Sequence, residues 1–169
     1  GDTGWHPDTG NAQQIAVKYI FYLDPVTAKT GALRVIPGSH LLQETERQIV
    51  SKGIQNTSLQ EVPCQAINSV PGDVIAFDIR TWHASYGGVR IRRACNLDYC
   101  QNPKASDEIG LLLRLGRSHA SSVNHFDTKR KFNYSKNWLE NPHQSQIRQC
   151  WIDRFNEIGY FDQLGVAEL

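Results

Sequence analysis

Two histidines and an aspartate are spaced in this chain as the ligands of a single iron ion would be. His6 and Asp8 form a His-x-Asp pair near the N-terminus, and His83 follows much later. In an extended chain residues i and i+2 point the same way, so His6 and Asp8 can reach one metal while Pro7 points away. Two histidines and one carboxylate hold one face of Fe(II) and leave the opposite positions open for substrate, cosubstrate and dioxygen. The spacing therefore predicts that these three residues bind one metal ion.

Short strands separated by turns surround the expected ligands. The runs are rich in β-branched and aromatic residues, which favour strands, and Gly or Pro residues break the chain between them. The expected strands are residues 15–23, 32–36, 74–77 and 91–99. Such strands indicate a sandwich or barrel, and a jelly roll of two sheets is the version that presents metal ligands to its interior. The pattern predicts a mainly β domain with appended helices.

Five motifs resemble, in order, those of the phytanoyl-CoA dioxygenase family. They are Gly4 to Asp8, Tyr22 to Pro25, Thr30 to His40, Pro71 to Val74, and His83 to Arg93. The resemblance covers residues 4–100 and implies a double-stranded β-helix, which is a cupin-like jelly roll with flanking helices. It also implies a dioxygenase that uses Fe(II), 2-oxoglutarate and O2, hydroxylates a small molecule, and releases succinate and CO2. The residues that match the family's iron ligands are His6, Asp8 and His83.

The resemblance also implies a site for the distal carboxylate of 2-oxoglutarate. Ser85 matches the family's His-x-Ser motif, and Arg92 matches its strand arginine. A guanidinium can hold a carboxylate through two parallel hydrogen bonds, which lysine cannot do. Arg93 remains the alternative, because neighbours on a strand face opposite sides and only one of the two can point inward. The family's order of arginine, basic residue and alanine favours Arg92.

Other interpretations of the same residues stay open. A cupin-like enzyme could use the three ligands with Zn or Mn and without 2-oxoglutarate. A non-catalytic member could keep the fold as a binding module. Halogenating relatives replace the carboxylate with a small residue, so the presence of Asp8 favours hydroxylation or a related oxidation.

Two further histidines are not expected to bind metal. His125 and Asp127 repeat the His-x-Asp spacing, but they lie in a polar stretch beside a basic cluster and predict a solvated loop. His40 follows a turn, and Ser39 before it is expected to be the N-cap of a helix over residues 41–50.

Length and charge suit one domain that acts on a small molecule. The 169 residues are expected to form a single oxygenase domain, with a metal- and cosubstrate-binding core over 1–100 and a helical and loop portion over 101–169. The net charge of +1 creates no strong field for nucleic acid or an anionic membrane. No apolar run approaches the ~20 residues of a membrane span. We expect neither nucleic acid nor membrane as a partner.

The cysteines indicate a reducing compartment, and we expect the cytoplasm. None of the four forms a CxxC pair; they are Cys64, Cys95, Cys100 and Cys150. Cys95 and Cys100 lie on or near one expected strand, and we expect both to be buried thiols.

The N-terminus predicts that part of the fold is missing. The chain contains no methionine and begins at Gly1, five residues before His6. A jelly roll needs about eight strands, and about five or six are expected between residues 15 and 99. The family normally carries a helical portion and a first strand ahead of its His-x-Asp pair. We therefore expect a fragment, or a chain whose N-terminal part was removed.

The C-terminal third is expected to be helical. One helix is predicted to begin at Ser106. A second, amphipathic helix is predicted to end at Gly159 and to pack its apolar stripe on the sheet. That stripe consists of Ile147, Trp151, Phe155 and Ile158.

Overall fold

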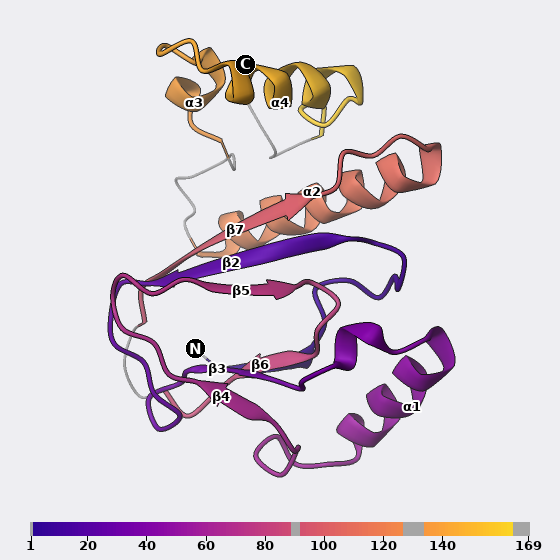
Figure 1. The fold of residues 1–169 in the computed structure, drawn as a ribbon, viewed down its shortest axis with the longest axis vertical. Helices are drawn as coiled ribbons and strands as arrows, with labels where there is room; N and C mark the ends of the chain where they lie inside the picture. Colours follow the sequence, from indigo (N-terminus) through magenta and orange to yellow (C-terminus); the bar gives the residue numbers. More distant parts are fainter. Residues whose placement is uncertain (1, 89–91, 127–133, 164–169) are drawn as a thin grey trace. The chain divides into compact units, whose positions relative to one another are not determined.

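The computed structural model of the chain describes residues 2–88, 92–126 and 134–163, the side chains of 119–126 excepted. The chain forms two compact units, Gly1–Gln101 and Asn102–Leu169. Within the described residues, every strand belongs to the first unit, together with a short 3-10 helix and the helix α1 (Figure 1). The helices α2, α3 and α4 belong to the second unit. Each unit is described by itself below.

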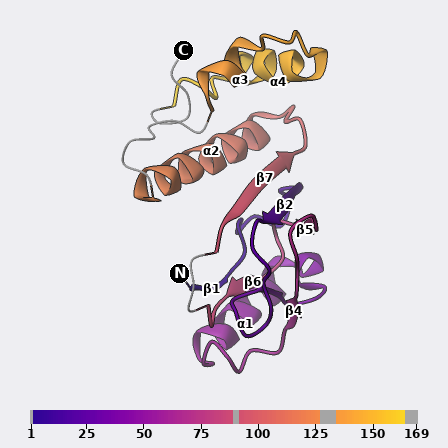
Figure 2. The same cartoon turned by 90° about the vertical axis from the view of Figure 1, so that its left-hand side faces the viewer.

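The first unit consists of two antiparallel sheets that face each other (Figure 2). One sheet has the strand order β1 (Thr3–His6), β6 (His83–Ser85), β3 (Leu33–Val35) and β4 (Gln65–Ile67). The other has the order β5 (Ile75–Asp78), β2 (Ala16–Tyr22) and β7 (Ala94–Cys100). The chain passes repeatedly from one sheet to the other, so the predicted mainly β double-stranded β-helix is confirmed.

All four strands with expected bounds are present, and β4 and β6 were not among them. β2, β3 and β5 lie within one residue of the expected bounds. β7 begins only at Ala94, three residues later than expected, and the expected first residue Ile91 lies outside the described residues. β4 and β6 have three residues each and only one β-branched residue, Ile67, between them, so their composition does not mark them as strands.

The core lies between the sheets, and one charged residue interrupts it. Alternate residues of β2 are buried, which is the expected pattern for a strand with one face on the core. The apolar cluster consists of Ile20, Tyr22, Val26, Ala32, Leu33 and Ile75. Lys18 lies in the same buried row of β2 and is only 8% exposed. A buried ammonium needs anionic partners, and Asp8 and Asp98 provide them.

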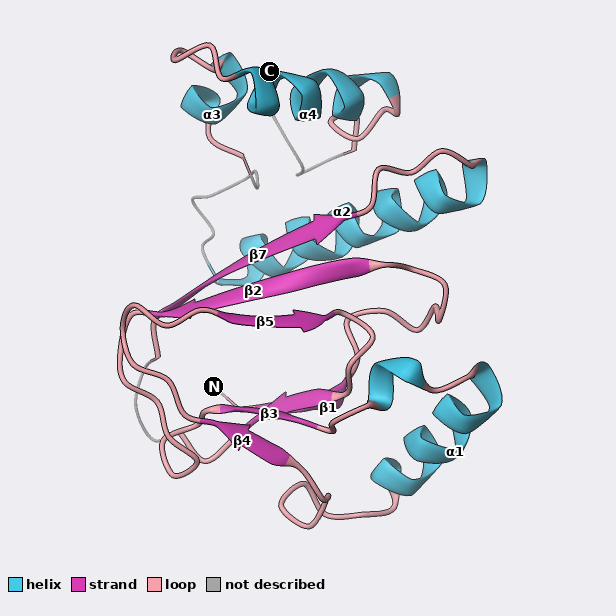
Figure 3. Cartoon of the chain, viewed as in Figure 1, coloured by secondary structure: helices cyan, strands magenta, loops and turns pink. Residues whose placement is uncertain are grey.

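The helix after β3 begins later than expected (Figure 3). Residues Ser39–Leu41 form a 3-10 turn, and α1 spans Glu44–Gln55 with Gln43 as its N-cap. The prediction that Ser39 caps a helix over 41–50 is therefore wrong. The hydroxyl of Ser39 donates to Ile36 O at 2.7 Å and accepts from the backbone N–H of Trp82 at 2.9 Å, so it fixes the chain just before His83.

The predicted burial of Cys95 is wrong. All four cysteines are unpaired, and Cys95 is exposed because it lies opposite Phe21 of β2, outside the buried row of that strand. Cys100 is half-buried, and burial raises the pKa of its thiol to about 11, with the charge of Asp98 acting in the same direction.

The second unit is helical, as predicted. It contains α2 (Ser106–Phe126), α3 (Lys136–Glu140) and α4 (Gln146–Glu157). Gly159 follows α4 with a φ of +69°, which ends the helix. Ile147 and Trp151 are exposed, and the buried residue of α4 is Ile152, so the predicted stripe is wrong for its first half. None of the helices that the structure describes is long and apolar enough to span a membrane.

Candidate functional site

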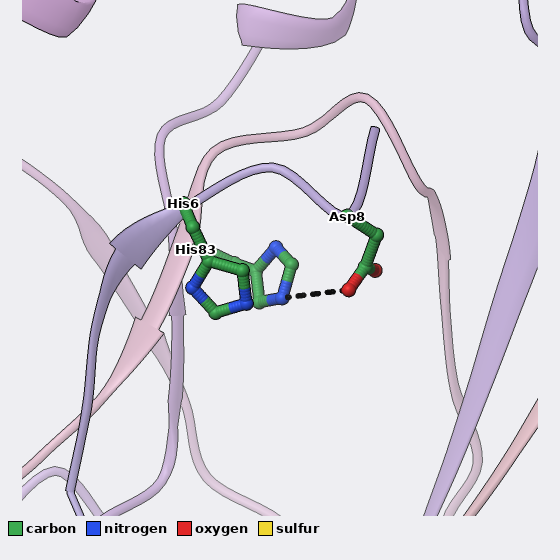
Figure 4. A group of neighbouring side chains, drawn as sticks. All are labelled: His6, Asp8 and His83. Atoms are coloured by element: carbon green, nitrogen blue, oxygen red, sulfur yellow. Dashed lines mark ion pairs between the residues drawn. The ribbon is translucent and has the colours of Figure 1, made fainter. Parts of the chain in front are cut away.

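Strand pairing brings the two expected histidine ligands together. His6 ends β1 and His83 begins β6, and the antiparallel pairing of these strands places the two residues opposite each other. Their ring centroids lie 4.4 Å apart. Asp8 follows β1, and its backbone N–H donates to Ile79 O at 2.9 Å. The potential ligand atoms of His6, Asp8 and His83 all lie within 4.8 Å of one another (Figure 4).

Backbone carbonyls orient both imidazoles. His6 Nδ1 lies 2.7 Å from Gly4 O, and His83 Nδ1 lies 2.9 Å from Thr81 O. A carbonyl oxygen only accepts, so each Nδ1 carries the hydrogen and each Nε2 keeps its lone pair. Metal-binding histidines are commonly fixed in this way, because the second hydrogen bond sets both the tautomer and the ring orientation. The arrangement leaves Nε2 of both rings available to a cation.

The environment of His83 keeps its ring neutral. Burial lowers the pKa of His83 below its ordinary 6.5, and this outweighs the opposite effects of the Asp8 carboxylate and the bond to Thr81 O. The edge of the Phe77 ring contacts the imidazole, with 5.0 Å between centroids. A metal binds the neutral imidazole, so the residue does not have to lose a proton first at neutral pH.

Asp8 is held between a histidine and a lysine. Its Oδ1 lies 3.8 Å from His83 Nε2, and its Oδ2 lies 2.8 Å from Lys18 Nζ. Lys18 Nζ is also 3.9 Å from Oδ1 of Asp98 on β7. Neither Lys18 nor Asp98 was expected near the metal site. The signal that could have found them is the alternation of β2, which predicts that Lys18 shares a face with buried apolar residues.

The three expected ligands fit one divalent ion. Ligand atoms bound at about 2.1 Å and at right angles lie about 3 Å apart. The candidate ligand atoms are up to 4.8 Å apart, so the three side chains would have to draw closer together around a bound ion. One carboxylate oxygen and two imidazole nitrogens are a set of ligand atoms that suits Fe(II).

Ser85 and Arg92 are in contact with each other. Ser85 lies two residues after His83 on β6, so both side chains face the same side of the strand. Arg92 Nη1 donates to Ser85 Oγ and to Gly31 O, and Ser85 Oγ donates to Gly31 O at 2.9 Å. The Arg92 guanidinium also opposes the rise in pKa that burial causes at Tyr22, an inward residue of β2.

Gly31 makes the approach of Arg92 possible. Its φ of +89° is a conformation that favours glycine, and a Cβ at this position would lie 2.9 Å from Arg92 Nη1. Any other residue would displace the guanidinium from Ser85. The glycine thus belongs to the same arrangement as the serine and the arginine.

The neighbouring arginine has a different environment. Arg93 donates to both carboxylate oxygens of Asp24, at 3.1 Å from Nε and 2.8 Å from Nη2, and its side chain is 66% exposed. Hydrogen bonds from Arg93 hold the pKa of Asp24 at about 2. Both arginines precede β7, so the expectation that they lie on a strand is wrong, but the two side chains do diverge.

Among the side chains that the structure describes, no further histidine joins this site. His40 lies in the 3-10 turn, outside the group of three. The second pair with His-x-Asp spacing, expected in a solvated loop, falls outside the described residues: the side chain of His125 and the whole of Asp127 are not described.

Comparisons with known proteins agree with the fold. The sequence model of the phytanoyl-CoA dioxygenase (PhyH) family matches residues 1–94, which is more than half of the chain. AviO1 from Streptomyces viridochromogenes Tue57 is 27% identical, with 62% of this chain and 47% of that chain covered and a TM-score of 0.50. EvdMO1 is 28% identical, with 59% and 23% covered and a TM-score of 0.48. EctD from S. alaskensis is 24% identical, with 60% and 39% covered and a TM-score of 0.43.

The match is partial in length. This chain spans less than half of each of these three solved structures. A comparison with curated proteins gave no significant match.

Proposed function

We propose, from the premise that the chain belongs to the phytanoyl-CoA dioxygenase family, that it is an Fe(II)- and 2-oxoglutarate-dependent dioxygenase. Its reaction would hydroxylate a small molecule and release succinate and CO2. The observation that carries the proposal is the convergence of His6, Asp8 and His83 within 4.8 Å. The free cysteines agree with a reducing compartment such as the cytoplasm, which is part of the same proposal.

Each ligand would have a defined role. His6 and His83 would bind iron through Nε2, because their Nδ1 atoms are held by Gly4 O and Thr81 O. Asp8 would bind through Oδ1, because Oδ2 is in contact with Lys18. When bound, Fe(II) with 2-oxoglutarate supplies the reactivity toward dioxygen, and the protein supplies orientation.

Ser85 and Arg92 would hold the distal carboxylate of 2-oxoglutarate. A guanidinium has five donors, and it pairs with a carboxylate through a planar fork. The contact between Arg92 and Ser85 puts a cation and a hydroxyl at one point, which suits an anionic group. Burial around this point would strengthen both hydrogen bonds.

One observation favours a second candidate. Arg92 already donates to Gly31 O and Ser85 Oγ, so it has a structural role without any cosubstrate. A cupin-like enzyme that binds a metal but does not use 2-oxoglutarate would have the same arrangement. The two candidates differ in whether 2-oxoglutarate binds to the metal-loaded protein.

An anaerobic titration separates these candidates. Fe(II) is added to the protein and then 2-oxoglutarate, while the visible absorption is recorded. We expect a weak charge-transfer band that saturates with 2-oxoglutarate, followed by succinate formation when air is admitted. Metal binding without the band would favour the cupin-like enzyme. Absence of metal binding would overturn both candidates and leave a non-catalytic binding module.

A further inference from the structure

Lys18 contacts the carboxylate of the expected metal ligand from inside the core. Its Nζ lies 2.8 Å from Asp8 Oδ2, and the two side chains are 10% and 12% exposed. Lys18 lies on β2 directly opposite Asp98 on β7, and Asp98 Oδ1 is 3.9 Å from the same ammonium. The three charged groups therefore form one buried row: Asp98, Lys18, Asp8.

A cation beside a metal ligand needs an explanation. The ammonium repels a divalent ion, and burial of a lysine is costly unless it is paired. A lysine that served only the core could be replaced by an apolar residue, as the rest of the buried row of β2 shows. The position of Lys18 therefore points to a role at the carboxylate rather than in packing.

The lysine contacts one carboxylate oxygen and leaves the other to the metal. It lies against Oδ2, whereas Oδ1 is the oxygen nearer His83 Nε2, at 3.8 Å. The Asp98 carboxylate, with Oδ1 3.9 Å from the ammonium, offsets its charge. Because Oδ2 is paired with Lys18, Oδ1 is the oxygen of Asp8 that lies nearer the histidines and remains for a metal.

The number of oxygens that Asp8 contributes decides how many metal positions stay open. A two-histidine, one-carboxylate set leaves about three of six octahedral positions free when the carboxylate binds through one oxygen. Binding through both oxygens would leave about two, which chelating 2-oxoglutarate would fill. No position would then remain for dioxygen.

We propose that Lys18, held by Asp98, is a positioning residue that keeps Asp8 a one-oxygen ligand and so preserves an open metal position. The inference rests on the proposed function, because it assumes that His6, Asp8 and His83 bind a divalent ion. It adds Lys18 and Asp98 to the site, and the number of water molecules on a bound metal ion measures their effect.

The test counts the water molecules on a bound metal. Mn(II) is loaded into the protein without oxygen, and the relaxation of solvent water protons reports the exchangeable waters on the ion. Three variants are compared with the unchanged protein: Lys18→Met, which removes the cation; Lys18→Arg, which restores a donor; and Lys136→Met, which removes an exposed lysine paired with Glu140.

We expect Lys18→Met to lower the relaxation enhancement per bound Mn(II) by about one third, since one of about three open positions closes. After 2-oxoglutarate is added, the remaining enhancement should nearly vanish in this variant and persist in the unchanged protein. Mn(II) affinity should be equal or higher, because a repelling charge is gone. Lys18→Arg should recover the enhancement, and Lys136→Met should not change it.

The outcomes distinguish the inference from the function on which it rests. Lower Mn(II) affinity with an unchanged enhancement per bound ion would mean that Lys18 only supports the fold, and it would overturn the inference. If Lys18→Met does not fold, the charge-balanced double variant Lys18→Met/Asp98→Asn takes its place with the same expectation. Failure of the unchanged protein to bind Mn(II) would instead overturn the proposed function.

Discussion

The strands β2 and β7 are associated with two ion-pair clusters whose environments are opposite. Between the sheets, Lys18 lies 2.8 Å from Asp8 and 3.9 Å from Asp98, with side chains 10–12% exposed. At the surface, Arg93 lies 2.8 Å from Asp24, with side chains 66% and 34% exposed. The shortest contact is the same in both clusters, so distance does not separate them.

The difference lies in the solvent. Water screens the surface pair and solvates each partner when the other is removed, so such pairs contribute little to stability. In the interior, water does not solvate a charge whose partner has been removed, so the loss of one partner is costly. The buried cluster can therefore hold the carboxylate of Asp8, an expected metal ligand, in one position, whereas the surface cluster connects the end of β2 to the start of β7.

The largest expected difference concerns the two aspartates. Asp8→Ala removes one of the three proposed metal ligands and should abolish Fe(II) binding, whereas Asp24→Ala should leave it unchanged. Isothermal titration with Fe(II) under nitrogen measures both. Undiminished binding by the Asp8 variant would show that the metal site lies elsewhere.

The next difference concerns the two cations. Lys18→Met leaves two buried carboxylates without their cation and should lower the free energy of unfolding of the metal-free protein by about 3 kcal/mol. Arg93→Met should cause no comparable loss, because water replaces the exposed guanidinium. Urea denaturation followed by circular dichroism compares the two variants. Equal losses would mean that burial does not distinguish the clusters.

The adjacent arginines Arg92 and Arg93 offer a second comparison, of a partly buried and an exposed cation, at the proposed 2-oxoglutarate site. Arg92→Lys keeps the charge but loses the fork, and should weaken 2-oxoglutarate binding by about 1.5–3 kcal/mol, which is about tenfold or more. Arg93→Lys should be nearly silent, because its partner is the exposed Asp24. Both affinities are measured in the anaerobic charge-transfer titration. If Arg92→Lys left the affinity for 2-oxoglutarate unchanged and Arg93→Lys weakened it, Arg93 rather than Arg92 would be the residue that binds the carboxylate.

The smallest expected effect is a pH dependence at the surface. Hydrogen bonds from Arg93 lower the pKa of Asp24 from 3.8 to about 2 in the folded protein. A lowered folded-state pKa contributes stability above the unfolded value, so this contribution should be lost as the pH falls from about 4 to about 2. NMR titration of the Asp24 carboxyl carbon should give a midpoint near 2. In Arg93→Met the midpoint should return toward 3.8, and an unmoved midpoint would contradict the assigned cause.

The sequence by itself determined the parts of this protein that depend on local spacing. The i, i+2 period of an extended chain relates His6 to Asp8 and His83 to Ser85, and the alternation of residues 16–22 marks a strand with one buried face. Turn residues around the longer strands were sufficient to predict a mainly β fold. These features need only a few consecutive residues, so they can be read before the chain folds.

Only the tertiary structure decided which distant residues meet. The register of β2 against β7 places Asp98 opposite Lys18, and the loop after β1 brings Asp8 to the same ammonium. The chain just before β7 directs Arg92 to Ser85 and Arg93 to Asp24. A local sequence pattern does not predict the register or the first residue of a strand. Both depend on the length of the turns and on how the strands then pair. The charges around the expected metal ligands therefore became visible only when both sheets were in place.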